Sequence, residues 1–248
     1  MDERTVTGRI DFKIAGEPVE IEMTVPADPV PLSRMLPVLS MATDRFVEVG
    51  VQASRSNGES VSCRKGCSAC CRQLVPISET EAFDLARLVD ELPEPLRSQV
   101  AGSFTEAVSK FAVSGLSDYL DQYASLPEPE QTEIHRRYYQ LGISCPFLYD
   151  DACSIHEKRP LVCREFLVTS DAANCWDPFK NPIKPVKLLF KTTDALRDLS
   201  RTEMFIPLIV SLEVARRYPR DERLKSGQEW IGAFFERLIE RTSTEVQD

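Results

Sequence analysis

The chain opens with two stretches in which apolar and polar residues alternate. Residues 5–15 and 19–25 each place every second side chain on an apolar face, with Ile10, Phe12 and Ile14 in the first and Val19, Ile21, Met23 and Val25 in the second. Strict alternation is typical of a strand with one buried face, and Gly16-Glu17-Pro18 between the stretches is typical of a turn. We therefore predict a β-hairpin within residues 1–30. A lone hairpin is marginal in water, so it must pack on the rest of the protein or offer an edge to a partner.

From residue 33 onward the apolar positions follow helical spacing. Pro37 falls in the first turn of the first helix, and Ser78 with Glu81 forms a capping box ahead of the second. The predicted helices are 33–57, 78–91, one through Phe104 and Phe111 ending near 113, 116–123, 130–141, a short one from Pro160 through Cys163 and Phe166, 193–201, 206–217 and 226–241. We expect a mainly α fold in which residues 31–248 form a single helical domain around a cysteine-rich metal-binding region at 63–175.

Composition and charge narrow the range of partners. The chain has 248 residues, 42% of them hydrophobic, and a net charge of −9, which argues against non-specific nucleic-acid binding because phosphates need a surplus of Lys and Arg. Its most apolar run, 204–210, is broken by Pro207 and is far shorter than the roughly 20 residues of a membrane-spanning helix. The start, Met1-Asp2-Glu3-Arg4, lacks a basic leader before an apolar stretch, so we expect no secretory signal and a cytoplasmic protein.

The cysteines are the most unusual feature of the sequence. They form a dense group with the spacing C-x3-C-x2-C-C, Cys63, Cys67, Cys70 and Cys71, and a looser group, Cys145, Cys153, Cys163 and Cys175. Two groups of four match the ligand count of tetrahedral zinc or of an iron–sulfur cluster such as 4Fe–4S. In a reducing compartment metal ligands or redox groups are expected more often than disulfides, so metal binding is the leading hypothesis and disulfide pairing the alternative.

The first group has features that suit metal binding. If Cys67 opens a helix, Cys70 and Cys71 lie on the same helical face, and Gly66 allows the chain to bring Cys63 close. A helix amino terminus would also lower the pKa of these thiols. The flanking cations Arg64, Lys65 and Arg72 together would offset the negative charge of a four-thiolate site, although for any one of them alone a solvated loop is the favoured interpretation.

The second group carries a family resemblance. Three segments carry it: Cys145-Pro146-Phe147-Leu148, Cys153-Ser154-Ile155-His156-Glu157-Lys158-Arg159-Pro160, and Cys163-Arg164-Glu165-Phe166. Over residues 63–175 the chain resembles the YkgJ-type cysteine-cluster family, described as a zinc- or iron-chelating domain. The resemblance implies that seven cysteines fall on the family's cysteine positions: Cys63, Cys67, Cys70, Cys71, Cys145, Cys153 and Cys163. Arg159, Pro160 and Arg164 fall on flanking positions, and Cys175 is a candidate eighth ligand. A related branch contains flagellin lysine-N-methylases, so methyl transfer enters as an alternative by analogy.

Several neighbouring residues are candidates for supporting roles. His156 is a possible ligand, but the family often has tyrosine there, which favours packing or hydrogen bonding beside the ligands. Arg159 and Arg164 would hydrogen-bond to sulfur or hold an anionic substrate, or simply lie on a helix surface. We expect Phe166, Trp176 and Phe179 to cover the metal, and His135 to be exposed.

Three functions remain open at this point. The first is a metal-binding protein that chelates zinc or iron through all eight cysteines. The second is a metalloenzyme of redox or methyltransferase type, against which the sequence has no glycine-rich strand-to-helix turn for a nucleotide. The third is an interaction module with a structural metal, in which the hairpin meets a protein partner. Enzyme status, the metal, and the choice between one multinuclear centre and two separate sites stay undecided.

Overall fold

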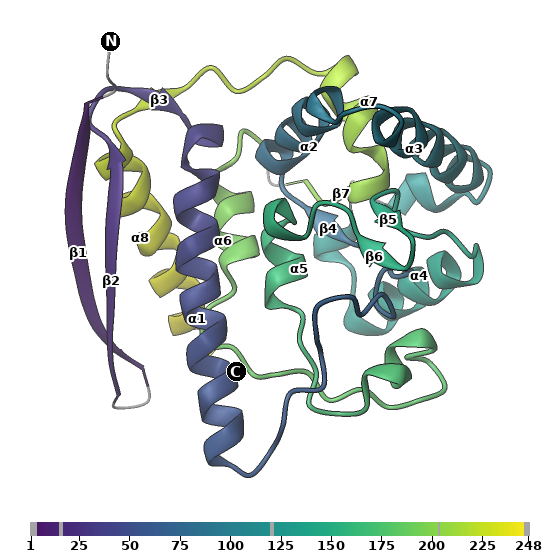
Figure 1. Cartoon of the computed structure of the whole chain (residues 1–248), viewed down its shortest axis with the longest axis horizontal. Helices are drawn as coiled ribbons and strands as arrows, with labels where there is room; N and C mark the ends of the chain where they lie inside the picture. Colours follow the sequence, from purple (N-terminus) through teal and green to yellow (C-terminus); the bar gives the residue numbers. More distant parts are fainter. Residues whose placement is uncertain (1–3, 15–16, 120–121, 203, 246–248) are drawn as a thin grey trace.

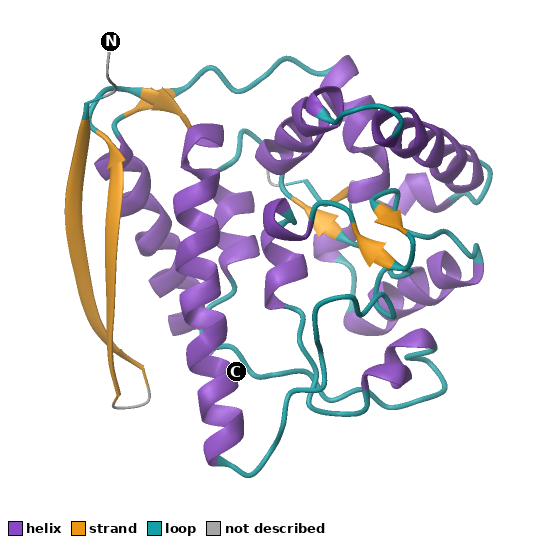
Figure 2. Ribbon diagram, viewed as in Figure 1, coloured by secondary structure: helices purple, strands orange, loops and turns teal. Residues whose placement is uncertain are grey.

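The computed structural model describes residues 4–14, 17–119, 122–202 and 204–245, and it is mainly helical with a long hairpin along one side (Figures 1 and 2). The helices are α1 (Leu36–Ser56), α2 (Glu79–Glu91), α3 (Leu96–Ala112), α4 (Glu128–Gln140), α5 (Leu161–Glu165), α6 (Thr192–Leu199), α7 (Ser211–Arg217) and α8 (Gly227–Glu245). The strands are β1 (Thr5–Ile14), β2 (Glu17–Pro26), β3 (Val30–Pro31), β4 (Pro76–Ile77), β5 (Leu148–Tyr149), β6 (Ala152–Cys153), β7 (Ile206–Pro207) and β8 (Leu224–Lys225). The predicted fold class is confirmed.

The hairpin docks on the helices through one apolar face. β1 and β2 pair antiparallel, and the inward side chains of β2, Val19, Ile21, Met23 and Val25, are at most 4% exposed. They belong to a core shared with α1, α6 and α8. The predicted turn is only partly tested, because Gly16 lies outside the described residues; Glu17 and Pro18, which we assigned to the turn, belong to β2.

Two further cores build the other half of the molecule. One lies among α2, α3 and the 147–155 segment and includes Leu85, Phe104 and Phe147; the other joins α4 to the chain before α7 and includes Tyr138 and Phe205. Ser78 and Glu81 form the predicted capping box at the start of α2. Among the described helices, none combines the length and apolarity needed to cross a bilayer.

Two predicted helices differ from the observed elements. The segment 116–123 forms only the short 3-10 turns Leu116–Tyr119 and Tyr123–Ser125, with 120–121 outside the described residues, because Gly115 has a φ of +69° and the available length is too short for a stable helix. The segment 206–217 begins as strand β7, because Pro207 disfavours helical backbone at the residue before it. β7 pairs with β4, and the helix α7 starts only at Ser211.

Candidate metal centre

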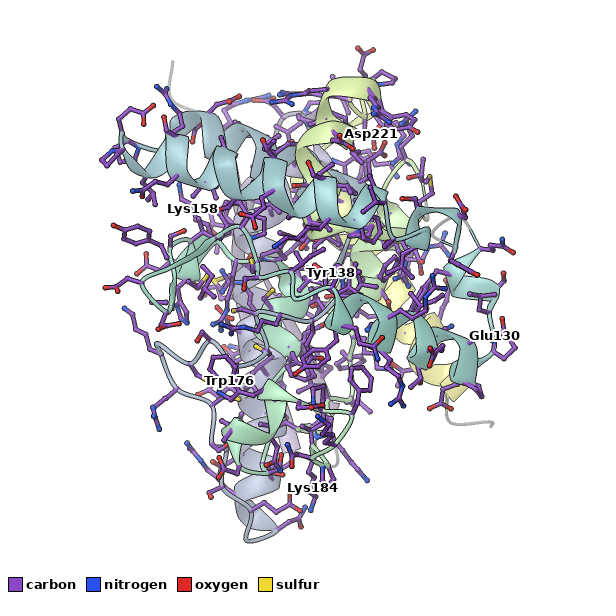
Figure 3. The ribbon with its side chains drawn as sticks, turned by 90° about the vertical axis from the view of Figure 1, so that its right-hand side faces the viewer. Glu130, Tyr138, Lys158, Trp176, Lys184 and Asp221 are labelled. Atoms are coloured by element: carbon purple, nitrogen blue, oxygen red, sulfur yellow. The ribbon has the colours of Figure 1, made fainter. Side chains whose placement is uncertain are left out.

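The two cysteine groups are brought together by backbone hydrogen bonds between distant segments. The amide of Cys145 donates to the carbonyl of Cys71 at 2.7 Å, and the amide of Ser62 donates to the carbonyl of Val168 at 3.0 Å. The amide of Val168 in turn lies 3.4 Å from Sγ of Cys63. In Figure 3, sulfur atoms gather between the labelled Lys158 and Trp176. The loops that carry the first group and the second group therefore lie side by side.

Seven cysteines line a single cavity of about 290 Å³. They are Cys63, Cys67, Cys70, Cys71, Cys145, Cys153 and Cys163. Cys175 is buried in an apolar cluster with Ala69 and Val168, against which Cys63, Cys67 and Cys70 pack. All eight cysteines are free thiols, so the cysteines are not paired in disulfides.

The local backbone of the first group differs from our expectation. Cys67 does not open a helix; instead, the amides of Cys67, Cys71 and Gln73 donate to the carbonyls three residues earlier, which makes separate turns. Gly66 adopts a φ of +85°, a left-handed conformation that suits glycine and reverses the chain between Cys63 and Cys67. The sulfurs therefore converge through turns rather than through one helical face.

The pKa values of the buried thiols are raised, whereas we predicted that they would be lowered. Burial raises the pKa of Cys145 to about 12 and that of Cys175 to about 11, and it raises the pKa of Cys163 well above its usual value. The pKa of Cys70 is raised by its hydrogen bond with the Cys71 thiol and then by burial. With no helix terminus beside them, desolvation prevails and the buried thiols are held neutral when no cation is bound.

Seven of the eight cysteines, all except Cys71, fall into two overlapping subsets that share Cys70. Cys175 is influenced by Cys70, Cys63 and Cys67, which also contact its apolar cluster. Cys163 is influenced by Cys145, Cys70 and Cys153, and both Cys145 and Cys153 pack against the core that contains Phe147. Each subset combines residues from both sequence groups, so the groups interleave.

The thiols are ligands of the type that a sulfur-preferring metal needs. In the structure, however, their sulfur atoms do not surround a common point. Within the described part of the chain, no three His, Cys, Asp or Glu side chains are arranged as a ready-made metal site. Thiolate ligands are those that zinc and iron–sulfur clusters prefer. Residues of the right chemistry thus line one cavity, and side-chain rearrangement would have to close them on an ion.

The three predicted supporting residues fall in different places. Arg159 and His156 line the cysteine cavity, and Nη1 of Arg159 lies 2.6 Å from Nε2 of His156. The charge of Arg159 lowers the pKa of Cys63, Cys70 and Cys153, although burial raises these pKa values by more. Desolvation, followed by the Arg159 charge, lowers the pKa of His156 and favours its neutral form.

Arg164 and Glu165 join the short helix α5 to the helices around it. Arg164 is buried, and its Nη1 donates to both carboxylate oxygens of Asp44 on α1 at 3.0 and 2.8 Å. Glu165 accepts hydrogen bonds from the backbone and hydroxyl groups of Thr192 and Thr193 at the start of α6. The residues that follow Cys163 therefore fix its position relative to the hairpin half of the molecule.

Sequence reasoning missed two features of the site. His135 is half-buried rather than exposed: it lines the cysteine cavity and its Nε2 lies 2.6 Å from the hydroxyl of Tyr123. Burial lowers its pKa, which favours the neutral imidazole. Arg72 stacks over Trp176 at 4.1 Å, and Trp176 is 43% exposed rather than covering the sulfurs. Of the predicted aromatic cover, Phe166 lines the cavity.

A helical body with a cavity lined by free thiols is the arrangement of a cysteine-cluster protein. Residues 62–180 match the family CxxCxxCC, whose description is "Putative zinc- or iron-chelating domain". This segment holds all eight cysteines, and the resemblance based on the cysteine motifs is confirmed. Neither the curated proteins nor the solved structures contain a match to this chain.

Proposed function

We propose that the protein binds zinc or iron through its eight cysteines. The observation that carries this proposal is the convergence of both cysteine groups on one cavity, supported by the match to a chelating family. The alternative ligands His156 and His135 are neutral imidazoles at the same cavity, but thiols outnumber them and form the continuous set.

We assign the thiols to two interleaved sets of four. The first comprises Cys63, Cys67, Cys70 and Cys175, which share an apolar cluster. The second comprises Cys71, Cys145, Cys153 and Cys163; Cys71 enters it through its backbone hydrogen bond to Cys145. Cys70 influences members of both sets, so a single multinuclear centre that uses it as a bridge is the alternative arrangement.

Charge explains why a bound cation would stabilise this region. Burial of ionised thiols is unfavourable and their mutual repulsion adds to that cost, so the pKa values of Cys145 and Cys163 are raised, first by desolvation and then by the neighbouring thiols. A divalent ion would compensate this cost, and Arg159 adds positive charge at the same cavity. A zinc ion would supply a structural link among the loops, whereas an iron–sulfur cluster would supply electron transfer.

Anaerobic purification followed by metal and sulfide analysis tests the proposal. A colourless protein with zinc and no sulfide, or a brown protein with equal iron and sulfide, supports it. A metal-free protein that keeps its fold in chelator contradicts it. In the variant Cys70→Ser, loss of metal together with unfolding would indicate a structural site, and loss of metal with a retained fold would indicate function at the metal.

A metalloenzyme is the second candidate, and the mainly apolar lining of the cavity favours it. Beside the sulfurs the cavity is lined by apolar side chains, among them Leu74, Phe147 and Leu208, with neutral His135 as a proton-accepting group. An apolar cavity with a few polar groups is typical of small-molecule sites. A methyltransferase of Rossmann type finds no support, because the sheets in the described residues are two-stranded and antiparallel.

In the interaction-module alternative a partner would meet the outer face or the edge of the hairpin, because its apolar face is buried against the helices. We retain residues 31–248 as one helical domain, because the core of α1, α6 and α8 is tied to the rest by Arg164 and by the bond of Glu81 to α5. A cytoplasmic location is part of the proposal and rests on the eight free thiols.

A further inference from the structure

A second cleft of about 830 Å³ shares Arg159 and Pro160 with the cysteine cavity, and residues of α1, of α2 and of the segment 157–164 line it. We propose that this cleft binds a small organic anion carrying two or more phosphate or carboxylate groups. The volume lies within the range of about 300–1,000 Å³ that is usual for small-molecule sites. This ligand is separate from the metal, because no cysteine lines the cleft.

The charge of the cleft is opposite to that of the whole chain. Six basic and four acidic side chains line it, in a protein with a net charge of −9. The basic side chains are Arg34, Arg87, Lys158, Arg159, Arg164 and Arg220, and the acidic ones are Asp44, Glu81, Asp84 and Glu157. A concave surface with an excess of one sign of charge attracts ions of the other sign.

Most of the acidic groups are already engaged inside the protein. Asp44 is paired with Arg164, Asp84 is paired with Arg87 at 2.5 Å, and Glu81 is buried with its oxygens bonded to Ser78 and Leu161. Burial also raises the pKa of Glu81, which reduces its negative charge. With two of these acids paired to Arg164 and Arg87 and a third buried, the cleft keeps an excess of basic over acidic side chains.

Three cations remain to meet a ligand. Among the described residues, Lys158, Arg159 and Arg220 have no carboxylate within ion-pair distance; Arg220 only lies over the ring of Phe83 at 5.9 Å. Nε of Arg159 is buried and has no hydrogen-bond partner in the described part of the chain. A buried donor without a partner is costly, and an anion in the cleft is one group that would satisfy it.

Arg159 also connects the two cavities. Together with Pro160 it lines both the cleft and the cysteine cavity. Because Arg159 lines both cavities and no cysteine lines the cleft, an anion that engages Arg159 from the cleft would lie next to the cysteine cavity. The cleft is thus placed to hold an anionic ligand beside that cavity.

Calorimetric titration of the full chain with citrate and with inorganic pyrophosphate tests the proposal, and the two probes distinguish carboxylate from phosphate ligands. We expect at least one probe to bind with a Kd below about 1 mM at low salt. The double variant Lys158→Gln/Arg220→Gln should weaken that binding by about 10-fold or more, since two direct cations are lost. Both residues are exposed, so the fold should be retained, which circular dichroism verifies.

The matched control is Lys187→Gln/Arg55→Gln, which removes the same charges from exposed positions outside the cleft. It should leave the Kd within about twofold of the wild type, because distant charges are screened. If both double variants weaken anion binding equally, the attraction is general and the proposal is overturned. Failure of both probes to bind the wild-type chain would also overturn it. Neither result would bear on the metal content, so failure here is distinguishable from failure of the proposed function.

Discussion

The amide of Cys145 donates a hydrogen bond of 2.7 Å to the carbonyl of Cys71, although the two residues belong to different cysteine groups. This bond places the first residue of the loose group beside the last residue of the dense group. From it follows the interleaving of the thiols, because the chain after Cys145 then lines the same cavity as the chain before Cys71.

Metal binding should release protons. Burial raises the pKa of Cys63, Cys145, Cys153, Cys163 and Cys175, so these thiols are protonated at neutral pH and must lose a proton to become ligands. Zn²⁺ affinity should therefore fall as the pH falls, by roughly tenfold per pH unit for each proton displaced. Calorimetry of metal-free protein in buffers of different ionisation enthalpy counts the protons.

Mg²⁺, which prefers oxygen ligands, is the control for that titration and should release none. Zn²⁺ binding without proton release would mean that the thiols are not the ligands.

Arg164 should be required for stability. Its guanidinium is buried and bonds Asp44 as well as the carbonyls of Arg159 and Glu157. Arg164→Ala should lower the free energy of unfolding by about 2–4 kcal/mol, because Asp44 and two carbonyls lose their donor. Urea unfolding measures this free energy.

The control is Arg45→Ala, which removes the exposed ion pair with Glu48 on α1 and should change the free energy of unfolding by less than about 0.5 kcal/mol. Equal effects of the two substitutions would refute the anchoring role of Arg164.

Glu81 should link the stability of α2 to that of α5. Its carboxylate accepts from the amide of Ser78 at 2.9 Å and from the amide of Leu161 at 2.8 Å. Glu81→Ala leaves both buried donors without a partner and should cost about 2–3 kcal/mol of unfolding free energy.

The stability of the protein should also depend on pH through Glu81. Burial raises the folded pKa of Glu81, so between the unfolded value of about 4.3 and the folded value the native state binds more protons than the unfolded state. The stability contributed by this group is full below the unfolded pKa and is lost as the pH rises through the folded pKa. Glu81→Gln should flatten this part of the stability–pH curve, whereas exposed Glu48→Gln should not; a slope unchanged by Glu81→Gln would contradict the assignment.

The docking of the hairpin depends on a glycine of α8. A Cβ atom on Gly227 would lie 2.5 Å from Cβ of Val25 and 2.8 Å from the carbonyl oxygen of Pro26. Gly227→Ala should therefore destabilise the protein by about 1–3 kcal/mol. Gly232→Ala on the same helix meets nothing within 4 Å and should stabilise it by about 0.5–1 kcal/mol, measured by thermal unfolding. Stabilisation by both substitutions would contradict the close packing.

Local sequence signals predicted much of the fold because they act over a few residues. The alternation around Ile21, the capping box of Ser78 and Glu81, and the position of Pro37 each specify a local conformation, and each is observed. The errors occurred where tertiary contacts decide the conformation. The spacing around Ile206 predicted a helix, but Pro207 and the pairing of Ile206 with Ile77 make this segment a strand.

The geometry of the cysteine cavity was harder to predict than the identity of the residues that line it. The cysteine count and motifs identified the candidate ligands, yet the turns around Gly66 and the burial that raises the thiol pKa values arise from long-range packing. His135 looked exposed because its neighbours Arg136 and Arg137 are charged. Its burial follows from contacts with Tyr123, which no local pattern encodes.

Metal content per chain, measured anaerobically in the wild type and in two double variants, tests the central claim most directly. Cys63→Ser/Cys67→Ser alters only the dense sequence group, and Cys153→Ser/Cys163→Ser alters only the loose one. If thiols of both groups hold metal in two sets of four, each double variant should retain about half of the wild-type zinc or iron. Wild-type metal content in either double variant would show that the thiols of that group are not ligands and would contradict the account.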